Sequence, residues 1–172
     1  MKKLIAILCL TVTLTACEGD QGPQGLPGIN GDEYAALSYE VDNIDFEYFN
    51  DTGLQEAIVP LPYDILDSDV VLVYRLEGIV DIDGQPTETW SPLPQNFFIS
   101  DTDTIQYIFN HTYADVQLLI DGNFDLSTLA ASYTQNQVFR IVILPADALS
   151  KTNTSNLNSV INTYDIKEFV KL

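Results

Sequence analysis

The chain has 172 residues, with 25 acidic residues against seven Lys and Arg, and its formal net charge at pH 7 is −18. A field of this sign repels phosphate backbones and anionic lipid headgroups, so nucleic-acid binding is not expected. Divalent cations and basic partners stay open, although such a charge also keeps a protein soluble and monomeric in a crowded compartment.

The N-terminal segment has the parts of an export signal that ends in a lipidated cysteine. Lys2 and Lys3 form a basic region, residues 4–14 are apolar, and the run 14–17 reads Leu-Thr-Ala-Cys. Cleavage before Cys17 would let its thiol carry a diacylglycerol and its new amine an acyl chain. The apolar stretch is shorter than the roughly 20 residues that cross a bilayer, so a transmembrane helix is not expected. Residues 1–16 are therefore predicted to be a signal peptide and Cys17 the lipidation site; the alternative is an ordinary small residue after a secretory signal.

Cleavage changes the composition of the mature protein. Two of the basic residues leave with the signal and every acidic residue stays, so five basic residues face 25 acidic ones and the net charge becomes −20. Cys9 also leaves with the signal, and alkylation of Cys17 uses up the remaining thiol. The mature fold is therefore expected to have no disulfide and no thiolate ligand, and its stability must come from core packing.

A strict glycine period follows the cysteine. Glycine recurs every third residue from Gly19 to Gly31, which makes five collagen-like triplets within residues 17–33. Only glycine fits at the axis of a collagen triple helix, and an extended chain of this kind rises about 3.1 Å per residue, or about 45 Å in all. The segment is predicted to be a monomeric, semi-rigid spacer; trimerisation through it is the alternative.

Residues 34–172 are long enough for a single domain with its own core. Apolar and polar side chains alternate along 44–48, which predicts a strand with one solvent face. Tyr39 and Val41 have the opposite parity, so a bulge or bend is expected near Asn43.

Two nearly continuous apolar runs, 70–76 and 138–144, predict central strands buried on both faces, with Arg75 and Arg140 at their edges. Shorter strands are expected at 54–59, 97–99, 105–109 and 116–120. Turn-forming Asn, Asp and Gly residues separate them. Many short strands at this spacing predict an all-β fold, mainly an antiparallel β-sandwich.

One short amphipathic helix is expected near the C-terminus. Apolar residues at 157, 160, 161 and 164 have helical spacing behind Thr154 and Ser155, which are candidate caps. A helical turn is expected at 146–150, and a closing strand at 169–172.

No motif in the sequence predicts catalysis. The only histidine, His111, follows a predicted strand, where a surface or hydrogen-bonding role is expected. The chain has no Gly-x-Ser-x-Gly element, no phosphate-binding glycine loop and no paired-histidine helix. A pair of carboxylates suited to glycoside hydrolysis would arise by chance among so many acids. We therefore expect no enzyme activity, no catalytic residue and no cofactor.

Aspartates occur in close groups that invite comparison with calcium loops. Asp81 and Asp83 precede Gly84, but the third acidic position and the final glutamate of a helix-loop-helix calcium site are missing. Asp-Gly is also a common hairpin turn. No metal site is predicted, and calcium is expected to change thermal stability weakly or not at all.

Trp90 is the one aromatic residue with a sequence context that suggests a ligand. It lies in the proline-rich run 89–94, which is predicted to be a loop that can display the indole ring to a sugar or a peptide. The competing interpretation is a core tryptophan that packs near Phe97 and Phe98.

The lipobox, the run 17–23 and segments such as 69–74 and 123–127 are similar to short collagen-like lipoproteins of Bacteroidota. The resemblance spans the chain and implies an envelope protein of a Gram-negative bacterium, but no activity. Glu18 and Asp20 resemble the acidic surface-export signals of that phylum. The run 103–105, Asp-Thr-Ile, resembles its O-glycosylation tripeptide, which makes Thr104 a candidate glycosylation site.

The function expected from these features is a lipid-anchored, non-enzymatic binding or structural module on a stalk in the cell envelope. The lipid on Cys17 would hold it at the outer membrane, with the cell surface or the periplasm as its location. An envelope protein or a glycan is the expected partner. The alternative is a glycan-binding or glycan-processing accessory lipoprotein.

Overall fold

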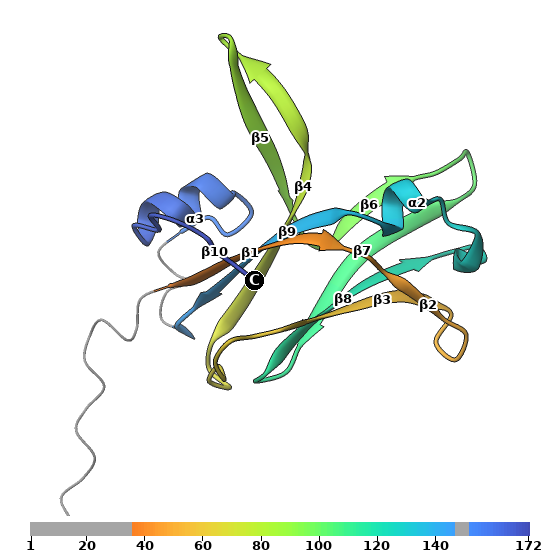
Figure 1. The fold of residues 1–172 in the computed structure, drawn as a ribbon, viewed down its shortest axis with the longest axis horizontal. Coiled ribbons are helices and arrows are strands. Elements are labelled where there is room, and N and C mark those ends of the chain that lie inside the picture. The colour runs from red at the N-terminus through yellow and green to blue at the C-terminus, as the bar shows by residue number, and fades with distance from the viewer. Residues whose placement is uncertain (1–35, 147–151) are drawn as a thin grey trace, which may run out of the picture. The chain divides into compact units, whose positions relative to one another are not determined.

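A computed structural model describes residues 36–146 and 152–172. The predicted signal peptide, Cys17 and the glycine-period spacer lie outside the described residues, as does nearly all of the turn expected at 146–150. The described chain builds two β-sheets that pack face to face, with short helices at their margins (Figure 1).

The first sheet, called sheet A, has the strand order β10-β1-β9-β4-β5. Its strands are β1 (Leu37–Ile44), β4 (Val70–Ile82), β5 (Gln85–Pro92), β9 (Gln137–Leu144) and β10 (Val170–Lys171). Neighbouring strands are antiparallel except β10, which pairs parallel to β1. Sheet A is therefore mixed, and the C-terminal residues close one of its edges, where the sequence predicted a closing strand.

The second sheet, called sheet B, is antiparallel throughout and has the order β2-β3-β8-β7-β6. Its strands are β2 (Glu47–Phe49), β3 (Leu54–Pro60), β6 (Gln95–Phe98), β7 (Thr104–His111) and β8 (Asp115–Gly122). The helical elements are the 3-10 helix η3 (Leu126–Thr128), α2 (Ala131–Thr134) and α3 (Leu157–Thr163). The expected all-β sandwich is confirmed, with one more short α-helix than predicted.

The main core lies between the two sheets. Alternate residues of β9, such as Phe139 and Ile141, point into it from sheet A, and Tyr107 and Leu118 point into it from sheet B. Phe46 joins them through edge contacts with the rings of Tyr107 and Phe139, at centroid distances of 6.0 and 6.1 Å. Burial of these large side chains is the main stabilising term of a fold without disulfides in its described part.

A smaller second core lies on the other face of sheet A, under α3. Val142 and Leu144 alternate with the inward residues of β9 and contact Leu157 and Val160 of the helix. Two buried faces explain why the run 138–144 is apolar at nearly every position. Asn156 is the N-cap of the helix, and its side chain accepts from the backbone N–H of Ser159 at 3.1 Å. The caps predicted for this helix are therefore wrong, because a residue closer to the first apolar position forms the bond.

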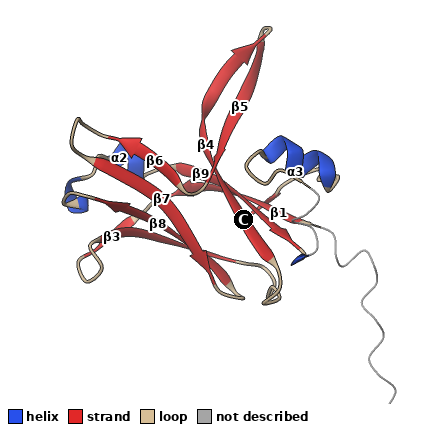
Figure 2. Cartoon of the chain, turned by 180° about the vertical axis from the view of Figure 1, so that it is seen from behind, coloured by secondary structure: helices blue, strands red, loops and turns tan. Residues whose placement is uncertain are grey.

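The strands β4 and β5 continue beyond sheet A as a two-stranded ribbon, which we call the arm and define as residues 78–89 (Figures 1 and 2). A register shift between Leu76 and Gly78 marks its base. Ile79, Val80 and Ile82 on the arm are largely exposed. The sequence analysis did not predict strand β5. Trp90 lies in this strand, so the loop expected at 89–94 was wrong.

The sequence interpretation of the first strand was right in one part and wrong in another. The pairing of β1 with β9 shifts between Val41 and Ile44, and Asn43 has a positive φ of 56°, as expected for a bulge there. The run 44–48 is not one strand, because the chain crosses from β1 in sheet A to β2 in sheet B.

The two arginines do not lie at strand edges. Arg75 is in the interior of β4 and is buried, and Arg140 is in the middle of β9, the central strand of sheet A. Both predictions were wrong. Strand β4 extends beyond its apolar segment, so Arg75 is not near its end. Each guanidinium group also lies over an aromatic ring, Tyr107 for Arg75 and Trp90 for Arg140, and this cation–π contact lets a charged side chain lie within the sheet.

Candidate functional site

The outer face of sheet B carries an open pocket of about 360 Å³ at the end of β6, β7 and β8. This volume lies within the range of about 300–1,000 Å³ that is common for small-molecule sites. Its lining residues are Asn96, Phe98, Thr104, Ile105, Gln106, Asp121, Gly122 and Asn123. We call this group the sheet B pocket.

The strand register builds this pocket. Asn96 of β6 lies opposite Gln106 of β7, and Gln106 lies opposite Asp121 of β8. Residues directly opposite one another in neighbouring strands point to the same face, with Cβ atoms about 5 Å apart. Two amides and a carboxylate therefore form one row across three strands. Beside it, Phe98 lies opposite Thr104.

Phe98 presents its ring to solvent. The residue is 84% exposed, whereas its neighbour Phe97 faces inward and contacts the rings of Tyr107 and Tyr133 at centroid distances of 5.6 and 6.1 Å. Period-two alternation requires these consecutive residues to point to opposite faces. A phenylalanine this exposed contributes little to folding, so its apolar surface remains available to a ligand.

The two side-chain amides in the polar row have no hydrogen-bond partner in the described part of the chain. The side chains of Asn96 and Gln106 form no hydrogen bond with any other residue within 36–146 or 152–172. Asp121 uses one oxygen, Oδ1, to accept from the Gly122 N–H at 2.7 Å. Each amide offers a donor and an acceptor, so the row presents both kinds of group to an incoming molecule.

Asn123 differs from these residues, because both the oxygen and the nitrogen of its side-chain amide form hydrogen bonds within the protein. Its Oδ1 accepts from the Thr104 N–H at 2.8 Å, and its Nδ2 donates to the Thr102 carbonyl oxygen at 2.7 Å. These bonds tie the chain that follows β8 to the start of β7. They hold the wall of the pocket in place beside Thr104.

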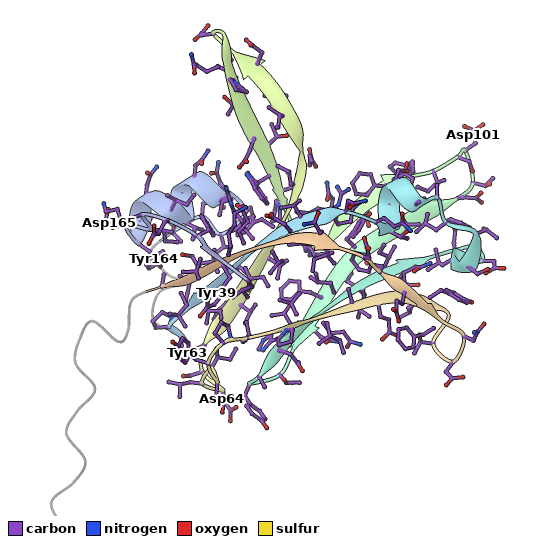
Figure 3. The ribbon with its side chains drawn as sticks, in the orientation of Figure 1. Tyr39, Tyr63, Asp64, Asp101, Tyr164 and Asp165 are labelled. Atoms are coloured by element: carbon purple, nitrogen blue, oxygen red, sulfur yellow. The ribbon has the colours of Figure 1, made fainter. Side chains whose placement is uncertain are left out.

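The electrostatic character of the pocket is negative. Its one ionisable lining residue is Asp121, and no lysine or arginine lines it. Figure 3 shows Asp101 at the tip of the loop that joins β6 to β7, at this same end of sheet B. An anionic ligand would meet repulsion here without a compensating cation.

Trp90, the predicted ligand residue, lies elsewhere, on β5 in sheet A. Its ring is partly buried against the second core, and the guanidinium carbon of Arg140 lies 4.0 Å from the ring centroid. The same carbon lies 4.5 Å from the centroid of the Phe169 ring. The indole N–H donates to Glu88 Oε2 at 3.2 Å. One face of the indole is therefore covered by a cation, and its polar atom is already bonded.

The acids around Arg140 complete this cluster. The guanidinium forms ion pairs with Glu40 at 2.8 Å and with Glu88 at 2.9 Å. Lys171 bridges Glu40 and Asp42 at 3.2 and 2.7 Å, and hydrogen bonds with Asp42 and Glu40 raise the pKa of its amine. Arg140 and the C-terminal strand are thereby joined to β1.

The other predicted positions are dispersed over the molecule. Thr104 lines the sheet B pocket, so the candidate glycosylation site and the exposed Phe98 are neighbours. His111 is the last residue of β7 and is exposed. Cys17 lies outside the described residues.

Two of the close aspartates, Asp69 and Asp81, hold turns through their side chains. Asp81 Oδ1 accepts from the Gly84 N–H at 2.8 Å, and Asp69 Oδ2 accepts from the Leu66 N–H at 2.9 Å. Within residues 36–146 and 152–172, no group of three or more His, Cys, Asp or Glu is placed to hold a metal ion. None of the described helices is long and apolar enough to cross a membrane.

The sequence analysis missed the sheet B pocket. The sequence predicted a strand at 97–99 and named Phe97 and Phe98 only as possible core neighbours of Trp90, and it assigned no role to Asn96 or Gln106. The register that aligns these side chains with Asp121 depends on pairing between distant segments.

Comparison with known proteins adds no assignment. No family model, no curated protein and no solved structure matches the chain.

Proposed function

We propose that this protein is a lipid-anchored, non-enzymatic binding module of the bacterial outer membrane, carried on a short extended spacer. The single observation that supports a binding role is the sheet B pocket, where an 84% exposed phenylalanine lies beside side-chain amides without partners in the described chain. Exposed apolar rings beside polar groups that have no hydrogen-bond partner in the protein are typical of recognition surfaces. The protein acts as a monomer that is displayed toward the cell surface.

The anchor in this proposal rests on the sequence of residues 1–17. Two or more acyl chains, each contributing about 0.8 kcal/mol per buried methylene, hold a protein stably at a membrane. The folded domain then needs no surface of its own for lipid. Its acidic charge fits this division, because it disfavours contact between the domain and anionic headgroups.

Lipidation is tested by feeding a labelled fatty acid to cells that produce the full chain. We expect the wild-type protein to incorporate the label and to fractionate with the outer membrane. Cys17→Ser should lose the label and accumulate as a longer precursor. Cys9→Ser is the matched control, since Cys9 is removed with the signal, and it should label as the wild type does. Label in the Cys17→Ser protein would contradict the anchor.

Two further measurements address the remaining parts of the proposal. Protease treatment of intact cells should remove the domain if it faces outward. Saturable turnover of any substrate by the purified protein would contradict a non-enzymatic role.

Modification at Thr104 is a separate part of the proposal. The intact mass of protein from a Bacteroidota host should exceed the calculated mass of the mature, lipidated chain by one glycan, and Thr104→Ala should remove that difference. An unmodified wild-type mass would contradict this assignment.

A further inference from the structure

We propose that the sheet B pocket binds an uncharged glycan, with one sugar ring stacked on Phe98 and its hydroxyl groups hydrogen-bonded to Asn96, Gln106 and Asp121. This inference rests on the proposed binding function and names its ligand class. It assigns the site to sheet B, away from Trp90.

The aromatic ring provides the first argument. A pyranose ring has a face of C–H groups that is nearly flat, and it buries this face best against a flat apolar surface. Phe98 supplies such a surface on a β-strand, where its backbone is fixed by pairing with Thr104 of β7. An aromatic side chain with two torsion angles also loses little entropy when a ligand covers it.

The polar row provides the second argument. Every sugar hydroxyl is both a donor and an acceptor, so it needs protein groups of both kinds at close spacing. The amides of Asn96 and Gln106 supply both, and Asp121 has an oxygen beyond the one that accepts from Gly122. Because each pair on neighbouring strands lies about 5 Å apart and the whole row spans about 10 Å, hydroxyls on one sugar or on two linked sugars can reach these groups together.

Charge selects against acidic sugars. The pocket holds a carboxylate and no cation, so uronic, sulfated or phosphorylated glycans would be repelled. The cations Arg140, Lys167 and Lys171 each pair with an acid elsewhere in the described chain. These charges favour a neutral glycan over an acidic one.

The competing occupant is a peptide that adds as a strand to sheet B. Strand β6 is at the edge of that sheet, and the outward backbone groups of an edge strand can pair with an extended peptide. Such binding would depend on main-chain hydrogen bonds along β6. It would not require the side chains of Gln106 and Asp121, which lie one and two strands further in. The side-chain amides of the polar row, which have no hydrogen-bond partner in the described chain, therefore favour the glycan over the peptide.

The test uses the full lipidated chain from a host that does not glycosylate it, so that no covalent glycan on Thr104 lies in the pocket, in a detergent whose headgroup contains no sugar. The probes are neutral hexasaccharides of glucose, mannose, galactose, xylose and N-acetylglucosamine, together with oligogalacturonate as the charged comparison, and binding is followed by calorimetry. We expect saturable binding of at least one neutral oligosaccharide and none of oligogalacturonate. Phe98→Ala should weaken that binding about tenfold or more, and Gln106→Ala should also weaken it. Phe98→Trp, which keeps an aromatic ring, should retain it.

Phe49→Ala is the matched control, since Phe49 is a second exposed phenylalanine of sheet B, on β2 at the opposite edge. It should bind as the wild type does. Because Phe98 is exposed, Phe98→Ala should keep the wild-type unfolding temperature, so a loss of binding would not reflect unfolding. Absence of binding to every neutral probe, or equal binding by the Phe98→Ala and wild-type proteins, would overturn the glycan assignment.

A random peptide library separates this inference from the proposed function. Peptide binding that is lost in Phe98→Ala, with no glycan bound, would reject the glycan and keep the binding module. Turnover of a bound probe would reject the non-enzymatic function itself.

Discussion

Arg75 is a buried cation in the main core. The residue is 9% exposed, and its guanidinium carbon lies 4.6 Å from the Tyr107 ring centroid and 5.1 Å from that of Phe97. Its Nε and Nη2 both donate to Gln137 Oε1, at 3.0 and 2.7 Å. One amide oxygen and two aromatic faces thus accommodate a charge that has no carboxylate partner in the described chain.

Removal of that amide is expected to be costly. Gln137→Leu would leave the guanidinium unpaired and would also take a donor from the carbonyl oxygens of Ser132 and Gln135. A buried charge that loses its hydrogen-bond acceptor destabilises a protein by about 3 kcal/mol. We expect that loss in the free energy of unfolding, measured by circular dichroism in urea. Gln135→Leu, at an exposed site two residues away, should change it by less than about 0.5 kcal/mol. Equal effects of the two substitutions would show that the buried cation does not need this amide.

Two buried tyrosines are expected to lower the stability of the fold at alkaline pH. Burial raises the pKa of Tyr74 and of Tyr107 to about 12. Their hydroxyls donate to the Thr154 and Tyr133 carbonyl oxygens at 2.6 and 2.5 Å. In the unfolded chain a tyrosine titrates near pH 10.

The direction of the effect follows from the two states. Between about pH 10 and 12 the unfolded chain releases these protons while the folded protein keeps them, so the free energy of unfolding falls as the pH rises. The two buried, protonated tyrosines make their full contribution to the free energy of unfolding below pH ~10, and this contribution is lost by pH ~12. Urea titrations across this interval should show the fall, and Tyr74→Phe and Tyr107→Phe should each make it shallower. A free energy of unfolding that stays constant up to pH ~11 would contradict the prediction.

At the scale of elements, the arm divides β4 into two parts of different stability. Residues 70–76 pair with β9 and β5 and lie against both cores, whereas residues 78–82 pair only with β5. The Glu77 carboxylate fastens the base of the arm, because it accepts from the Ser91 hydroxyl and from the Gln95 amide. An isolated two-stranded ribbon is marginally stable in water.

Amide hydrogen exchange should therefore differ sharply within this one strand. We expect the amides of 78–82 to exchange through local opening, at least about a hundredfold faster than the hydrogen-bonded amides of 70–76, which exchange near global unfolding. Mass spectrometry of peptides that divide β4 near Glu77 measures both parts at once. Uniform protection along β4 would contradict the prediction and would indicate that the arm is covered in solution.

For the whole molecule, alternation along the chain predicted much of the sandwich because burial decides those positions. In β9, Phe139 and Ile141 face one core and Val142 and Leu144 face the other, so a strand buried on two sides could be predicted without its partners. The bulge at Asn43 could also be predicted, because the parity of the apolar residues changes there.

Strand β5 could not be predicted in the same way. Its residues are largely polar and include prolines, and its outer half pairs with β4 in solvent, where no core imposes a pattern. The sheet B pocket was missed for a related reason. Asn96, Gln106 and Asp121 are separated in sequence, and only the register of three strands brings them together. An outward-facing site carries no hydrophobic signal of its own.

Strand β1 is the first part of the fold that a pull through the N-terminal segment would load. It pairs with β9 at six register positions and with β10 on its other side, and Lys171 ties it to the C-terminal strand. A terminal strand at a sheet edge would peel away one hydrogen bond at a time. At Tyr39 and Glu40 the strand pairs on both sides, so there the bonds to β9 and β10 must break together. These two positions should resist a pull more than Leu37 and Ser38, which pair with β9 alone in the described chain.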